Sequence, residues 1–112
     1  MTLEEMRTLS ARAAASRVPF NGSIAMTHRC NLRCLHCYLG DERSPGSAAG
    51  ELDTAFWLSV VDQVADAGGL NLLITGGEPL LRDDFAEVYT RAKKRGLVVT
   101  LFTNGTRLDD GL

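Results

Sequence analysis

All three cysteines of the chain lie in one eight-residue stretch, CNLRCLHC, at positions 30–37. Cys30, Cys34 and Cys37 are separated by three residues and then by two. Thiolates are soft ligands that select zinc, Cu(I) or iron–sulfur clusters. Three of them on a short loop can hold a cubane cluster and leave one iron without a protein ligand. Because such an iron can bind a small molecule, the spacing indicates a reaction site and not only an electron store.

A structural zinc site is the main alternative interpretation of this stretch. His28 and His36 lie close to the cysteines and could complete a Cys₃His site. Structural zinc usually joins ligands from two separated knuckles, and the sequence has no second cysteine pair. Inert packing is a further alternative, which the crowding of three thiols in a polar loop disfavours. A disulfide framework would spread the cysteines apart, so we expect free thiols in a reducing compartment, the cytoplasm.

Two further segments carry residues suited to a ligand. In GGEP at 76–79, Gly76 and Gly77 allow close backbone approach, Glu78 offers a carboxylate to a cation, and Pro79 fixes the backbone. TNGT at 103–106 contains an Asn-Gly pair. Both segments can equally be plain turns, because glycine, proline and asparagine are the usual turn residues.

Helical and extended patterns alternate along the rest of the chain. Thr2 and Glu5 match a capping box, which predicts a first helix that ends near Ser16. Later helices are predicted where apolar residues recur at helical spacing, and strands where short apolar runs occur. The expected strands span 22–27, 70–75 and 97–102, and the later helices begin at Asp53 and at Asp83 or Asp84 and end at Gly68 or Gly69 and at Gly96.

This order predicts an α/β fold with a parallel sheet, in which each crossover forms a right-handed βαβ unit. The continuous apolar run LNLLIT at 70–75 is typical of a strand buried on both faces. The cysteine stretch, GGEP and TNGT each follow one of the three strands. Since ligands of parallel α/β folds bind at the carboxyl ends of the strands, we expect the three loops at one edge.

Composition narrows the remaining possibilities. The chain has 112 residues, a formal net charge of −2 and 45% hydrophobic residues, which fits one globular domain. The sequence has no excess of basic residues that would favour nucleic acid and no apolar run long enough to span a membrane. We therefore expect neither nucleic acid nor a membrane as a partner. Residues 1–20 are rich in Ala, Ser and Arg, but Glu4 and Glu5 argue against a transit peptide.

CNLRCLHC together with TGGEP at 75–79 resembles the radical S-adenosylmethionine (radical SAM) enzymes, from about Gly22 onward. The cysteine spacing matches the CxxxCxxC pattern of that family, and TGGEP matches its GGE motif. The resemblance implies that Cys30, Cys34 and Cys37 hold a 4Fe-4S cluster. It also implies that the open iron binds the amino and carboxylate groups of S-adenosylmethionine.

The resemblance assigns further residues to the bound S-adenosylmethionine. Gly76, Gly77 and Glu78 match the motif that holds the methionine ammonium. His36 occupies a position that is usually aromatic in the family and lies near the adenine. Asn104, in the turn after the third strand, matches a loop that lines the same pocket.

The activity that the resemblance implies is radical catalysis. A reduced cluster cleaves S-adenosylmethionine to a 5′-deoxyadenosyl radical, which abstracts hydrogen from a substrate, with a flavodoxin or ferredoxin as electron donor. CNLRCLHCY with GGEPLL resembles the branch of peptide and cofactor maturases with a carboxyl-terminal SPASM-type domain, so the expected substrate is a peptide or protein. A non-catalytic iron–sulfur or zinc module is the alternative function.

The implied fold is a partial (β/α)₆ TIM-like barrel, for which six units need on the order of 180 residues. The chain is therefore expected to form the first half of that barrel. Residues 1–20 are a predicted N-terminal helical extension, and residues 21–112 are the predicted start of the radical SAM core domain. We expect residues 1–112 alone not to turn over a physiological substrate.

The cysteine assignment predicts the metal content of variants. Replacing Cys30, Cys34 or Cys37 with Ala should remove most of the iron after anaerobic reconstitution, because each thiolate holds one iron. Iron with sulfide in the unaltered protein supports a cluster, whereas zinc alone supports the non-catalytic module. A triple-Ala variant that keeps the full iron content would sink the assignment.

Overall fold

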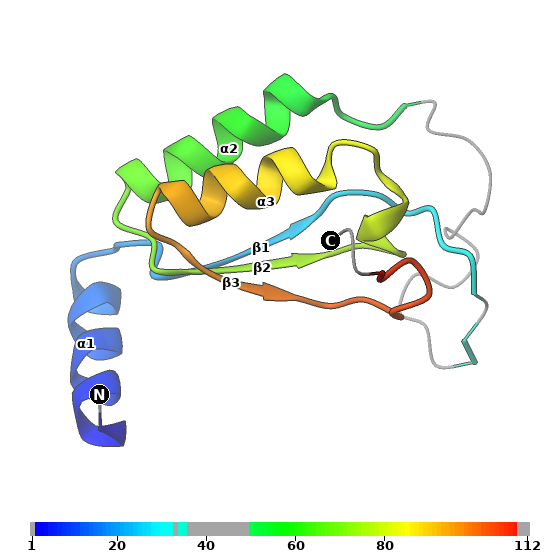
Figure 1. Cartoon of the computed structure of the whole chain (residues 1–112). Coiled ribbons are helices and arrows are strands. Elements are labelled where there is room, and N and C mark those ends of the chain that lie inside the picture. Colours follow the sequence, from blue (N-terminus) through cyan, green and yellow to red (C-terminus); the bar gives the residue numbers. More distant parts are fainter. Residues whose placement is uncertain (1, 33, 36–49, 110–112) are drawn as a thin grey trace.

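The computed structural model describes residues 2–32, 34–35 and 50–109, which form a three-stranded sheet, the helices between its strands on one face, and a separate N-terminal helix (Figure 1). The expected order of elements is confirmed. In chain order these are α1 (Leu3–Ala15), β1 (Asn21–Ala25), α2 (Thr54–Asp66), β2 (Asn71–Thr75), a 3₁₀ turn (Pro79–Leu81), α3 (Phe85–Lys94) and β3 (Val98–Leu101).

The sheet is parallel, and its strands lie in the order β1-β2-β3. Ile24 pairs with Ile74, and Ile74 pairs with Leu101. Figure 1 shows α2 and α3 side by side over the same face of this sheet. Sequential strand order with both crossover helices on one face is the winding of a (β/α) barrel, whereas doubly wound sheets carry helices on both faces. The predicted parallel α/β class is confirmed.

The core lies between the sheet and the two helices above it. Leu72 and Ile74 alternate with half-buried residues along β2, and only these two side chains of the strand reach the core. The core is completed by residues from β1, α2, the 3₁₀ turn and α3 and from two positions that flank strands: Ile24, Met26, Trp57, Val61, Leu80, Phe85, Val88, Ala92 and Leu97. From β3, Val99 and Leu101 are partly buried and pack against this core. The prediction that 70–75 is buried on both faces is only half met, because no described element covers the second face.

The first helix is determined by local signals. Thr2 accepts a hydrogen bond from the amide of Glu5 at 3.1 Å, and the Glu5 carboxylate accepts one from the amide of Thr2 at 2.6 Å, so the capping box is present. α1 stands apart from the sheet at the amino ends of the strands (Figure 1), and Leu3 and Met6 are exposed. None of the helices in the described ranges has the length and apolar character that crossing a membrane requires.

The later helix ends follow the expected residues with one difference. Asp53 caps α2 by accepting the amide of Phe56 at 2.8 Å. Gly96, with a φ of 82°, follows α3 in the left-handed conformation that favours glycine. Asp84 takes the N-cap position of α3 as expected, but its carboxylate makes no capping hydrogen bond. That carboxylate is instead bound by a neighbouring guanidinium.

This guanidinium belongs to the buried Arg82, which joins three elements. It donates to the carbonyl of Met26 at 3.0 Å and to the carbonyl of Leu52 at 2.9 Å. Two further hydrogen bonds, of 2.8 and 2.7 Å, reach Asp84. Because a buried cation is costly unless its donors are satisfied, these four bonds hold the end of β1 and the starts of α2 and α3 together.

The Arg82–Asp84 pair predicts acid sensitivity. The hydrogen bond from Arg82 lowers the pKa of Asp84 below its ordinary value, against the opposing effect of burial. A depressed pKa contributes stability that is full above the unfolded-state pKa of about 3.9 and is lost as the pH falls through the folded-state value. Asp84→Asn should therefore lower the free energy of unfolding by about 1–3 kcal/mol at neutral pH and by progressively less below about pH 4.

Urea unfolding at neutral and acidic pH measures this difference. Asp66→Asn is the matched control, because Asp66 pairs with Arg95 at the surface with 71% of its side chain exposed. Exposed pairs contribute about 0–1 kcal/mol, so this control should unfold almost as the parent does. A loss in Asp84→Asn that stays constant from neutral pH to pH 3 would contradict the linkage.

Candidate functional site

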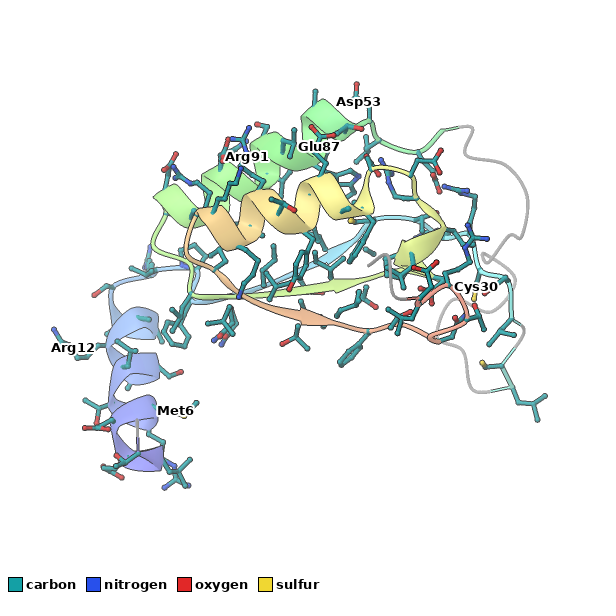
Figure 2. The ribbon with its side chains drawn as sticks, viewed as in Figure 1. Met6, Arg12, Cys30, Asp53, Glu87 and Arg91 are labelled. Carbon is teal, nitrogen blue, oxygen red and sulfur yellow. The ribbon has the colours of Figure 1, made fainter. Side chains whose placement is uncertain are left out.

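The three segments singled out in the sequence meet at the carboxyl ends of the strands. Figure 2 shows Cys30 beyond these strand ends, at the opposite end of the molecule from Met6 and Arg12 of α1. The segments after β1, β2 and β3 are joined there by hydrogen bonds among residues 27–31, 77–78 and 103–106. The predicted convergence of the loops is confirmed for the described residues.

The β1 and β2 loops are in direct backbone contact. The amide of Gly77 donates to the carbonyl of Thr27 at 2.7 Å, and the amide of Glu78 donates to the carbonyl of Arg29 at 2.7 Å. A Cβ atom on Gly76 would lie 2.4 Å from the Thr27 oxygen, and one on Gly77 would lie 2.3 Å from the Arg29 oxygen. Because the two glycines lack Cβ atoms, the backbone just before Cys30 can lie directly against the β2 loop.

The side chain of Glu78 joins the β2 loop to the β3 turn. It is fully buried. Its Oε1 accepts from the Thr103 hydroxyl at 2.5 Å and from the Leu80 amide at 3.2 Å, and its Oε2 accepts from the Asn104 amide at 2.7 Å. An ionised carboxylate has about four acceptor positions, so the described donors leave one on Oε2. Because no surface of the side chain is exposed, a ligand could reach that position only if a neighbouring segment shifted.

The β3 turn is tied in the same way to the cysteine segment. The side-chain amide of Asn104 donates to Oδ1 of Asn31 at 2.8 Å. The side-chain amide of Asn31 donates to the hydroxyl of Thr106, in the same turn, at 2.7 Å. These two bonds place the exposed Asn104 beside Cys30, with its Nδ2 3.9 Å from the Cys30 Sγ.

Two of the three predicted cluster ligands can be placed. Cys30 is half-buried and Cys34 is exposed. The Cys30 Sγ accepts from the Leu32 amide at 3.5 Å and faces the Asn104 amide, and N–H groups directed at sulfur are typical of iron–sulfur ligands. The donor set therefore fits a cluster. Cys37 and His36 lie outside the described residues, within which no three candidate ligands converge.

Glu51, which the sequence patterns did not indicate, binds the residues just before Cys30. Both carboxylate oxygens of Glu51 accept hydrogen bonds from Arg29, each at 3.1 Å, and Oε2 also accepts from the Thr27 hydroxyl. Burial by itself raises the pKa of Glu51, but the hydrogen bonds from Arg29 and Thr27 outweigh it, so the pKa lies below its ordinary value. No short-range signal could have predicted these pairs, because their members are 22 and 24 residues apart.

Comparisons with known proteins agree with the motifs. The model of the Radical SAM superfamily matches residues 24–112. A PqqA peptide cyclase from Gluconobacter oxydans is 41% identical over 87 residues, which cover 76% of this chain and 23% of that protein. An Fe-coproporphyrin III synthase from Methanosarcina barkeri is 37% identical over 84 residues, or 75% of this chain and 21% of that protein.

A solved structure shows the same fold. The crystal structure of SuiB from Streptococcus suis matches with a TM-score of 0.69 and 22% sequence identity, over 96% of this chain and 24% of that chain. The chain thus spans about a quarter of the length of the relatives and of the structure that it matches.

The contact between residues 76–77 and 27–29 predicts that one added methyl group lowers the free energy of unfolding substantially. Gly77→Ala should destabilise the chain by about 1–3 kcal/mol, because its Cβ has no room against the Arg29 carbonyl. Gly22→Ala in β1 is the control, since its Cβ would meet the nearest side chain at an ordinary 3.7 Å. Urea midpoints compare the two variants. Equal midpoints would mean that the close approach does not constrain residue 77.

Proposed function

The chain belongs to the radical SAM superfamily, whose members use a 4Fe-4S cluster and S-adenosylmethionine. From this premise we propose that the loops at the carboxyl ends of its three strands bind these two cofactors. In this proposal Cys30, Cys34 and Cys37 hold the cluster. When bound, the reduced cluster would supply one electron for cleavage of S-adenosylmethionine into methionine and a 5′-deoxyadenosyl radical, and this radical would abstract a hydrogen atom from a substrate. The observation that carries the proposal is the convergence of three loops at Cys30, whose sulfur faces N–H donors.

The role of the protein at this edge is to bind and orient. We place the methionine ammonium at Gly76, Gly77 and Glu78, as the motif implies. Gly77 is half-buried at the edge, and the buried carboxylate of Glu78 lies directly behind it. A negative charge that is shielded from water attracts a nearby cation more strongly than an exposed one does.

Asn104 and His36 complete the proposed cofactor contacts. The side-chain amide of Asn104 donates to Asn31 and lies beside the Cys30 sulfur. This position supports a place for Asn104 on the wall of the proposed cofactor pocket. His36 lies outside the described residues, and its contact with the adenine rests on its position before Cys37. We further propose that residues 1–20 are an extension and residues 21–112 the start of the core domain, which agrees with the isolation of α1 in Figure 1.

For the whole protein we propose a peptide substrate, a flavodoxin or ferredoxin as electron donor, and a cytoplasmic location. The peptide proposal is supported by several similar relatives that are named PqqA peptide cyclase. The sheet face opposite the helices offers a surface toward a substrate. Across it, Ser23 pairs with Leu73 and Leu73 pairs with Thr100, and none of the three is fully buried.

Glu78 provides the test of cofactor binding. Glu78→Gln keeps the shape of the side chain and removes its charge. Because the buried charge then no longer attracts the methionine ammonium, S-adenosylmethionine should bind the full-length protein about tenfold more weakly, a loss of about 1.4 kcal/mol. Cluster content should stay unchanged, because the cysteines lie on a different loop. The measurement is a binding titration on reconstituted protein, with iron quantified in parallel.

Thr103→Val is the matched control, because it removes one donor to Glu78 and leaves the charge in place. It should change the affinity by less than about threefold. Unchanged affinity in Glu78→Gln would falsify the ligand role and leave GGEP as a turn. Loss of iron together with affinity would mean that Glu78 supports the fold of the loops instead.

A further inference from the structure

Glu51 joins two residues that immediately precede the first cysteine. Its carboxylate accepts from the hydroxyl of Thr27 and, through both oxygens, from the guanidinium of Arg29. Thr27 is buried with 3% exposure, and the side chains of Arg29 and Glu51 are 17% and 15% exposed. A two-point guanidinium–carboxylate contact with so little exposure fixes geometry far better than a surface ion pair does.

The sequence positions of these partners make the contact important for the metal centre. All three cysteines lie between Arg29 and Glu51. Bringing the two ends of such a segment together costs conformational entropy, which must otherwise be overcome when the ligands gather around a cluster. A contact between residues 27–29 and residue 51 closes the segment before any metal binds, so less conformational entropy is lost when the cluster binds. The contact thus preorganises the cysteine segment.

The same residues are also held from the other side. The carbonyls of Thr27 and Arg29 accept from the amides of Gly77 and Glu78. Arg82 places a second positive charge near Glu51, with its Nη1 3.9 Å from Oε1. The short segment before Cys30 is therefore fixed by its backbone to the β2 loop and by its side chains to Glu51.

We propose that Glu51 is a positioning residue for the cluster. By binding Thr27 and Arg29, it holds residues 27–29 against the two-glycine loop and thereby sets where the cysteine segment begins. The cluster part of this inference rests on the proposed function. The positioning part concerns only the chain's own contacts and is measurable in metal-free protein.

Amide hydrogen exchange in the metal-free, full-length protein tests the positioning. The amides of Gly77 and Glu78 report directly whether residues 27–29 remain attached, because they donate to that segment. Glu51→Gln keeps the size of the side chain and one acceptor oxygen. It should make these two amides exchange about tenfold faster and leave the amide of the fully buried Val61 unchanged. Glu87→Gln, the same change at an exposed position of α3, should alter neither.

Two results would overturn the positioning. Unchanged exchange at Gly77 and Glu78 would mean that Glu51 does not hold the segment. Equal acceleration at Val61 would mean that the substitution lowers global stability instead. Asp84→Asn separates these effects further, because it weakens the neighbouring Arg82 pair without removing a partner of Thr27 or Arg29.

Iron release from reconstituted protein to a ferrous chelator tests the consequence for the cluster. Glu51→Gln should lose iron about tenfold faster than the parent, whereas Asp84→Asn and Glu87→Gln should lose it at the parent rate. Release at the parent rate from Glu51→Gln overturns the link to the cluster, and equal acceleration in Asp84→Asn assigns the effect to stability. A parent protein that binds no iron refutes the proposed function, and the exchange experiment still decides the positioning.

Discussion

The backbone of residues 76–78 lies directly against the backbone of residues 27–29, and the arrangement of the whole carboxyl edge depends on this contact. Two hydrogen bonds of 2.7 Å continue the pairing of β1 and β2 beyond the last strand residues. The approach leaves no room for a Cβ atom at Gly76 or Gly77. Because the segment that carries Cys30 is one side of this contact, the glycines of the second loop determine where the cysteines of the first loop begin.

Two carboxylates with little exposure extend this contact to further segments of the chain. Glu78 binds the β3 turn through Thr103 and Asn104, and Glu51 binds the cysteine segment through Thr27 and Arg29. A buried carboxylate without donors is strongly destabilising, so each side chain permits few arrangements of the loops around it. The apolar core under α2 and α3 holds the sheet together but does not select one loop arrangement in this way.

This rigidity suits the chemistry of the superfamily. A cluster with one open iron needs three thiolates in fixed positions, and a bound S-adenosylmethionine needs an oriented wall beside it. In the function that we propose, the glycine loop at 76–77 and Asn104 would form that wall. The helix-free face of the sheet lies next to this edge. Figure 1 shows that the described helices leave this face uncovered, which agrees with a partial TIM-like barrel.

The sequence by itself determined the α/β class, the order of the elements, the capping of α1 and α2 and the meeting of the three loops, because each of these follows from contiguous patterns and from the directionality of parallel strands. It also indicated Cys30, Glu78 and Asn104 as neighbours. Only the tertiary structure decided that Glu78 bonds Thr103 and that Glu51 bonds Arg29, since these partners are 25 and 22 residues apart. Such pairs form because strand order and register bring whole loops beside one another. No local sequence pattern encodes which residues of two distant loops then come into contact.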